Sequence, residues 1–260
     1  MFMKKMEREE YSDMLYEAER SRTQIQPLTS MDESLNIDDA YYIQLNNIDR
    51  AVKAGQVISG KKIGLTSEGM QKQLGVGEPD YGHLFECMDC HDNKVSVDAL
   101  IQPKIEAELA FVLKDDLSGE NITAEDVVAA TDYVVGAFEI VDSRIADWKI
   151  KLVDTIADNA SSGRYILGTK RISPTSELAD ITMNLYKNGE FLATGSGAAV
   201  LGDPCLAVAW LANRLKDYGV MLKKGEVILS GAFSAAPEAT RGDKFTAEFS
   251  ELGTITAEFI

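Results

Sequence analysis

Gln102-Pro-Lys-Ile-Glu-Ala-Glu-Leu-Ala-Phe-Val112 has the alternating pattern of a β-strand. Because successive side chains of a strand point to opposite faces, one face is lined by Ile105, Ala107, Leu109 and Phe111. Glu106 and Glu108 then project from the other face, roughly 7 Å apart along the strand. Two carboxylates at this spacing repel each other unless a positive charge lies between them. A solvated strand face is the alternative interpretation, since glutamate is mostly exposed.

A second apolar run, Val134-Val-Gly-Ala-Phe-Glu-Ile-Val141, predicts a buried strand with one charged residue, Glu139. Burying a carboxylate is costly unless it is paired or bound to a metal. Glu139 is therefore a third candidate ligand, and an ion pair with Arg144 just beyond the strand is the structural alternative. Carboxylate ligands of this kind favour Mg²⁺ or Mn²⁺ over zinc.

Composition limits the classes of partner. The chain has 260 residues, of which 26 are basic and 42 acidic, giving a formal charge of −16. This balance argues against nucleic acid and anionic membranes as partners, because both favour a basic face. The sequence has no long apolar run and its first 22 residues lack a signal-peptide pattern, so we expect a cytoplasmic protein. Cys87-Met-Asp-Cys90-His91 matches a haem-attachment pattern, but we interpret it as a loop with incidental cysteines.

The rest of the chain predicts helices that flank a sheet-rich core. Helices are expected over residues 3–22, 37–54, 66–74, 121–133 and 203–219, with Asn36, Thr123 and Asp203 as caps. A polar connector is expected at 23–35 and a turn at 78–82. Further strands are expected over 56–65, 164–167, 227–230, 244–249 and 254–260, with a hairpin of 181–186 and 191–194 around Asn188-Gly189. Of the adjacent Lys61 and Lys62, one is expected to be solvated and the other to point inward.

Strands dominate the second half, which predicts an α+β fold with a substantial mixed or antiparallel sheet. We expect an N-terminal helical portion over residues 1–55 and a catalytic β-rich domain over 56–260, built as one structural unit. A dinucleotide-binding fold is not expected, because Val200 stands where the third glycine of that fingerprint would be needed.

Seven stretches together resemble the 2-keto-4-pentenoate hydratase family, within the fumarylacetoacetate hydrolase superfamily. They follow the family's order over nearly the whole chain: Gly60-Lys-Lys-Ile-Gly-Leu-Thr66, Pro79-Asp-Tyr-Gly82, Gln102–Glu108, Phe138–Arg144, Asp154–Ala160, Gly195–Gly202 and Trp210–Asn213. Two positions depart from the family's pattern. Lys104 stands where arginine is common, and Ser162 stands where hydratases often have cysteine.

The resemblance implies a rolled, mixed β-structure with three carboxylate metal ligands, matching Glu106, Glu108 and Glu139. It places a lysine and an aspartate beside the metal, matching Lys62 and Asp80, with Asp80 as the acid/base. Two further positions are expected to help hold the substrate: Ser161 and the backbone near Leu65.

Family members hydrate 2-hydroxypenta-2,4-dienoate or decarboxylate 4-oxalocrotonate. Asp80 and the pair Asp147-Trp148 resemble the hydratases, so we expect hydration to 4-hydroxy-2-oxopentanoate in aromatic-compound catabolism. The alternatives are the decarboxylase, a non-catalytic partner subunit, and a carbon–carbon bond hydrolase. The hydrolase usually needs a histidine base, whereas His83 and His91 both lie in one loop-like segment. The resemblance also implies a homo-oligomer and a complex with a pathway decarboxylase.

Overall fold

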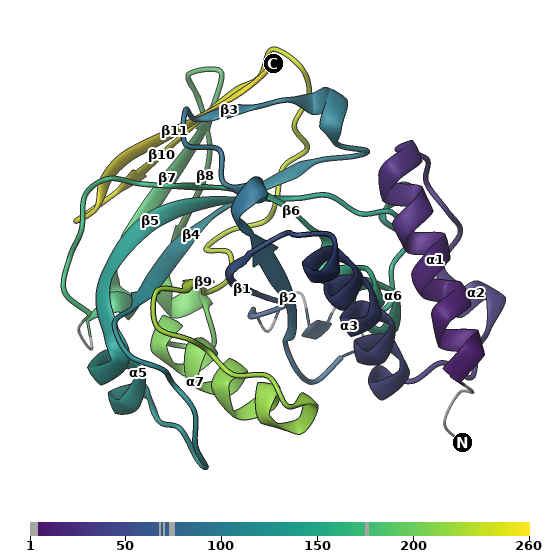
Figure 1. Cartoon of the computed structure of the whole chain (residues 1–260). Helices are drawn as coiled ribbons and strands as arrows, with labels where there is room; N and C mark the ends of the chain where they lie inside the picture. Colours follow the sequence, from purple (N-terminus) through teal and green to yellow (C-terminus); the bar gives the residue numbers. More distant parts are fainter. Residues whose placement is uncertain (1–4, 68, 70, 73–75, 175–176) are drawn as a thin grey trace.

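The computed structural model describes the chain except residues 1–4, 68, 70, 73–75 and 175–176. Its centre is formed by two curled β-sheets, with helices packed around them (Figure 1). The six-stranded sheet has the order β2 (Asp80–Phe85), β1 (Ile58–Gly64), β9 (Val227–Leu229), β4 (Lys104–Leu113), β5 (Thr131–Val141), β6 (Ser162–Leu167). The five-stranded sheet has the order β3 (Lys94–Val95), β11 (Gly253–Phe259), β10 (Lys244–Phe249), β7 (Thr182–Lys187), β8 (Glu190–Ser196).

The six-stranded sheet is mixed and rolled. β1 is parallel to β9 and antiparallel to β2, whereas β4, β5 and β6 are antiparallel neighbours. The sheet curls until its far strand approaches β1, where the Tyr165 hydroxyl donates to Ser59 Oγ over 3.1 Å. The predicted α+β class with a rolled, mixed β-structure is confirmed.

The helices begin where the sequence supplies caps. They are α1 (Lys5–Ser21), α2 (Leu28–Met31), α3 (Ile37–Lys53), α5 (Ala124–Ala130), α6 (Leu152–Ala157) and α7 (Pro204–Leu215). The side chains of Asn36 and Thr123 each accept a backbone N–H three residues on, and Asp203 caps α7 ahead of Pro204. Such caps satisfy amides that have no partner within the helix, so they fix its first residue. Gly219 adopts the left-handed conformation (φ 68°) after the last turn.

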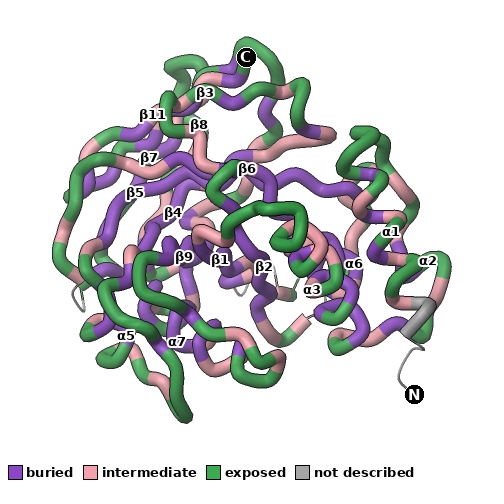
Figure 2. Tube along the Cα trace, in the orientation of Figure 1, coloured by how far each residue is buried: buried purple, intermediate pink, exposed green. Residues whose placement is uncertain are grey.

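The helices and both sheets share one hydrophobic core. Leu15 and Ile43 from α1 and α3 belong to the same buried cluster as Phe111 and Phe245 from the two sheets. Figure 2 shows the central strands buried and the outer faces of the N-terminal helices exposed. A division of the chain after residue 55 stays a prediction. Within the described residues, no helix has the length and apolar character needed to cross a membrane.

Several local expectations were wrong because distant partners override local propensity. The expected turn at 78–82 instead enters β2, since Asp80 pairs with Gly64 of β1. The helix expected over 121–133 ends at Ala130, and residues 131–133 extend β5. The connector at 23–35 contains the short helix α2. The helix expected over 66–74 lies partly outside the described residues.

The expectation for the adjacent lysines was also wrong, because neither is solvated. Lys61 and Lys62 are both buried, and they point to opposite faces of β1 as a strand requires. Lys61 Nζ forms an ion pair with Glu226 Oε1 at 2.6 Å, a residue 165 positions away in the sequence. Lys62 faces the interior of the roll, where the candidate site lies.

Candidate active site

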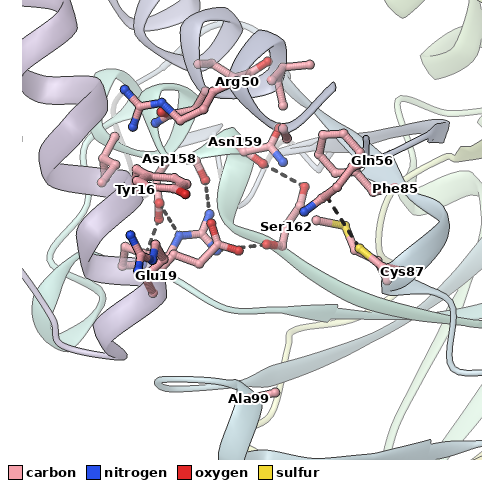
Figure 3. Close-up of a pocket in the computed structure, with 18 of the residues that line it drawn as sticks. Tyr16, Glu19, Arg50, Gln56, Phe85, Cys87, Ala99, Asp158, Asn159 and Ser162 are labelled. Carbon is pink, nitrogen blue, oxygen red and sulfur yellow. Dashed lines mark hydrogen bonds and ion pairs between the residues drawn. The ribbon is translucent and has the colours of Figure 1, made fainter. Parts of the chain in front are cut away.

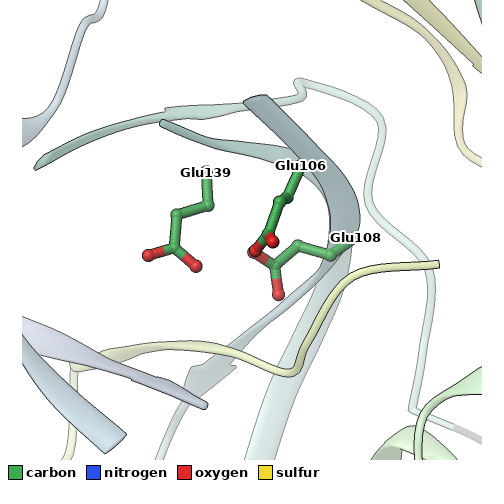
Figure 4. A group of neighbouring side chains, drawn as sticks. All are labelled: Glu106, Glu108 and Glu139. Carbon is green, nitrogen blue, oxygen red and sulfur yellow. The ribbon is translucent and has the colours of Figure 1, made fainter. Parts of the chain in front are cut away.

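Three glutamates meet on the inner face of the six-stranded sheet (Figure 4). Glu106 and Glu108 project from β4, and Glu139 lies directly opposite Glu106 on β5. Because directly opposed residues of antiparallel strands share a face, the register brings all three carboxylates together. One oxygen of each lies within 4.8 Å of the others. Among the described residues this is the only such group of three or more acidic, histidine or cysteine side chains.

The three carboxylates are incompletely satisfied by the protein. Glu108 and Glu139 are fully buried, and Glu106 is half-buried. The Gly231 amide donates to Glu108 Oε2, but Glu108 Oε1 and Glu139 Oε2 are buried without a hydrogen-bond partner. Burial, together with the charges of Glu139 and Glu106, raises the pKa of Glu108 well above its usual value. Burial also raises the pKa of Glu139 to about 7. A cation between these oxygens would give the unpartnered oxygens a ligand and would favour the charged form of the carboxylates.

The donor set fits a hard divalent ion. All available ligand atoms are carboxylate oxygens, which suit Mg²⁺ or Mn²⁺ better than zinc. Cys87 and Cys90 are free thiols, and neither belongs to this group.

Lys62 lies beside the triad and is held from two sides. Its Nζ is 3.1 Å from Glu139 Oε1 and donates to the Ala160 carbonyl over 2.9 Å. Burial opposes the charge on Lys62, but Glu139 and Asp80 outweigh it and raise the pKa of the ammonium group. Lys62 is therefore a fixed positive charge next to two acidic groups.

Asp80 is fully buried at the start of β2, opposite Gly64. A Cβ on Gly64 would lie 2.2 Å from Asp80 Oδ1, so only glycine leaves room for this carboxylate. Asp80 Oδ2 accepts a hydrogen bond from Thr155 Oγ1 at 3.1 Å, while Oδ1 has no partner. Burial raises the pKa of Asp80, and Lys62 and Thr155 oppose that rise. A carboxyl with one free oxygen and a raised pKa is suited to proton transfer.

The segment after α6 carries Ser161, one of the predicted substrate-binding positions. Asn159, Ala160 and Ser161 all have left-handed backbones, with φ of 53°, 48° and 54°. None of them is glycine, so this run is strained and must be held by its surroundings. It presents the Ala160 carbonyl to Lys62, and Ser161 Oγ is buried without a partner.

A buried ion pair holds this segment. Arg144 bonds Asp158 through Nε and also donates to the carbonyls of Asp142 and Ser162, at 2.7 and 2.9 Å. The Arg144 amide donates to Asp158 Oδ2 over 2.9 Å. The alternative in which Arg144 pairs with Glu139 is therefore wrong, because the guanidinium is committed to Asp158. Glu139 pairs with Lys62 instead.

The other predicted positions lie in defined places. Leu65 follows β1 with a left-handed backbone (φ 57°), and its carbonyl accepts from Gln71 Nε2 over 2.8 Å. His83 lies in β2 and not in a loop. Burial and the charge of Lys61 lower its pKa to about 3. Its Nδ1 is 3.2 Å from Gln44 Oε1. A neutral, enclosed histidine of this kind does not serve as a base near neutral pH.

Sequence reasoning missed two groups that complete the site. Thr155 bonds Asp80, and the Gly231 amide bonds Glu108. Thr155 lies inside a stretch already noted for its family resemblance, which is the one signal that could have pointed to it. Nothing local marks Gly231, since its partner is 123 residues away.

A cavity of about 650 Å³ lies elsewhere, between α1, α3 and the segment around Asp158 (Figure 3). Tyr16, Arg50 and Asn159 are among its lining residues, but none of the three glutamates is. The cavity and the carboxylate cluster therefore mark two different places in the molecule. We place the site at the carboxylates, because they combine unsatisfied oxygens with a lysine and a buried acid.

Residues 87–260 match the family model of the fumarylacetoacetate (FAA) hydrolase C-terminal domain. The chain is 47% identical to a 2-keto-4-pentenoate hydratase of Paraburkholderia xenovorans, over 99% of this chain and 96% of that protein. It is 46% identical to a 2-hydroxyhexa-2,4-dienoate hydratase of Comamonas testosteroni, over 94% of each. The fold matches a 4-oxalocrotonate decarboxylase of Pseudomonas putida, solved with magnesium and adipate, with a TM-score of 0.95 and 35% identity over 100% of this chain and 99% of that one. The chain belongs to the fumarylacetoacetate hydrolase C-terminal family, in the group of the 2-keto-4-pentenoate hydratases.

Proposed function

We propose that the protein is a metal-dependent hydratase that converts 2-hydroxypenta-2,4-dienoate to 4-hydroxy-2-oxopentanoate. The observation that carries the proposal is the buried carboxylate triad with unpartnered oxygens, next to Lys62 and Asp80. The hydratases to which the chain is similar support it, at 46% and 47% identity over nearly the whole chain.

Glu106, Glu108 and Glu139 would hold the ion, which we propose is Mg²⁺ or Mn²⁺. Magnesium and calcium in two structures of the related decarboxylase support a divalent ion at this site. When bound, the ion supplies Lewis-acid polarisation of the substrate's C2 oxygen.

Lys62 stabilises the negative charge that develops on the C2 oxygen, because it is a buried ammonium held in place by Glu139 and Ala160. Asp80 acts as the acid/base through its free Oδ1. It assists proton delivery to C5 of the dienol and the addition of water at C4. Ser161 Oγ, which is buried without a protein partner, and the backbone at Leu65 help to hold the substrate.

The location, assembly and pathway of the enzyme are part of the proposal. We infer a cytoplasmic homo-oligomer that acts in meta-cleavage catabolism of aromatic compounds and associates with a pathway decarboxylase.

The test is the ultraviolet loss of freshly generated 2-hydroxypenta-2,4-dienoate in the presence of Mg²⁺, Mn²⁺ or a chelator. Metal-dependent loss that yields 4-hydroxy-2-oxopentanoate is the expected result. Inactivity on this dienoate under all three conditions would contradict the proposal.

The second candidate is 4-oxalocrotonate decarboxylation, favoured by the fold match to that enzyme. It predicts carbon dioxide release from 4-oxalocrotonate under the same conditions. The Asp80 carboxyl and the higher identity to hydratases favour hydration. A catalytically inactive partner subunit would process neither compound.

A further inference from the structure

The exposure of the triad-bearing face of β4 changes along the strand. Along β4, Glu108 is fully buried, whereas Glu106 and Lys104 are half-buried. These three side chains share one face of the strand, because alternate residues point the same way. The exposure gradient therefore places the mouth of the site on the Lys104 side of Glu106. Lys104 is roughly 7 Å from Glu106 along the strand.

Lys104 forms no ion pair with the described residues. Within the part of the chain that the structure describes, no carboxylate lies within ion-pair distance of its Nζ. The ammonium group instead lies over the Trp148 ring, 4.5 Å from the ring centroid. Burial raises the pKa of Glu106, and the charges of Lys62 and Lys104 oppose that rise, so Lys104 acts on the triad.

Trp148 is held in position by a strained turn. Asp147 and Trp148 both have left-handed backbones, with φ of 56° and 54°, which is rare for a bulky aromatic residue. The indole Nε1 donates to the Gln102 carbonyl over 3.1 Å, which fixes the ring beside the start of β4. Backbone strain of this kind gathers at functional sites. Here the strained turn places the Trp148 ring against Lys104 at the mouth of the site.

We propose that Lys104, steadied by Trp148, captures the carboxylate of an anionic substrate at the mouth and passes it to the metal site. The inference rests on the proposed function only in that the substrate is a carboxylate. A protein with a net charge of −16 repels such anions at long range, and an unpaired cation at the mouth opposes that repulsion locally. Lys62 cannot take this part, because it is buried and engaged with Glu139.

The test measures how fast adipate binds to the Mg²⁺-loaded protein, using stopped-flow tryptophan fluorescence. A Trp210→Phe background leaves Trp148 as the reporter, since the chain has two tryptophans. In Lys104→Gln we expect the association rate constant to fall about three- to tenfold at low ionic strength. The difference should largely vanish near 0.5 M salt, where charges are screened over a few ångströms. Lys104→Arg should retain the rate.

The matched control is Lys244→Gln, which removes an exposed lysine of the other sheet. Calorimetry of adipate with the same proteins provides a second readout that needs no fluorescence change. Three results would overturn the proposal: no adipate binding to the wild-type protein, equal rates and affinities in Lys104→Gln and the control, or a loss that persists at high salt. Because no turnover is measured, failure of the hydratase assay would leave this result interpretable.

Discussion

The fold contains two clusters of buried charge, the Arg144–Asp158 pair and the carboxylate triad, and their polar atoms are satisfied to different degrees. At Arg144 and Asp158 nearly every donor meets an acceptor within the protein, including two backbone carbonyls and a backbone amide. In the triad, oxygens of Glu108 and Glu139 are buried with no hydrogen-bond partner. Asp158, Glu108 and Glu139 are all buried, so burial alone does not distinguish the two clusters.

The difference separates a structural use of charge from a functional one. A buried ion pair that is complete within the protein fixes a conformation, here the left-handed run that presents Ala160 to Lys62. A buried cluster that is incomplete is costly in the protein alone and becomes favourable when a ligand completes it. Mutations at the Arg144–Asp158 pair should therefore lower stability first, whereas mutations in the triad should remove metal binding and activity first.

The largest effect is expected from Glu108→Gln. Losing one ligand should abolish Mg²⁺ binding and lower kcat/KM by about a thousandfold or more, because the ion's charge stabilisation is worth several kcal/mol. Metal binding would be measured by calorimetry and turnover by dienoate absorbance. Glu251→Gln, which changes an exposed glutamate, is the control. Wild-type turnover in metal-free Glu108→Gln would show that the reaction does not need the metal.

The complete cluster should respond in stability first. Arg144→Met leaves the buried Asp158 unpaired and should lower the free energy of unfolding by about 3–5 kcal/mol. Urea unfolding would measure it. Arg241→Met removes an exposed ion pair with Asp98 and should cost at most about 1 kcal/mol. If both variants lost the same small amount, the view of Arg144 as a structural clamp would be wrong.

Asp80→Asn separates proton transfer from metal binding. The amide keeps the shape but cannot exchange a proton, so kcat should fall about 10²- to 10⁴-fold with metal affinity unchanged. Turnover close to wild type would exclude Asp80 as the acid/base.

The smallest effect is expected from Thr155→Val, which removes the hydrogen bond to Asp80 Oδ2. That bond favours the charged carboxylate and lowers the pKa of Asp80. Its loss should therefore move the Asp80-dependent limb of the pH–rate profile to higher pH. A reduction of kcat of about fivefold corresponds to one hydrogen bond of about 1 kcal/mol. Thr155→Ser should restore the profile, and an unmoved limb in Thr155→Val would rule out this positioning role.

Local sequence patterns predicted what depends on alternation and capping. Alternation placed Glu106 and Glu108 on one face, and the single charge in an apolar run identified Glu139 as a candidate. Caps at Asn36, Thr123 and Asp203 were read correctly for the same reason, since each depends on neighbours within three residues.

Long-range partners could not be predicted in this way. Glu226, which pairs with Lys61, is 165 residues away in the sequence. Residues 78–82 have a turn-like sequence, but Asp80 begins β2 because it pairs with Gly64 of β1. The left-handed run at 159–161 contains no glycine to signal it in the sequence, and Arg144, which donates to the next carbonyl at Ser162, comes from another part of the chain. Local propensity contains no information about such contacts.

The most direct test is calorimetric titration of Mg²⁺ into the metal-free wild-type protein, Glu108→Gln and Glu251→Gln. We expect one Mg²⁺ site in the wild type and in Glu251→Gln, and none in Glu108→Gln. We also expect Mg²⁺ to raise the Tm of the two binding proteins only. Equal Mg²⁺ binding by all three would show that the incomplete triad is not the metal site.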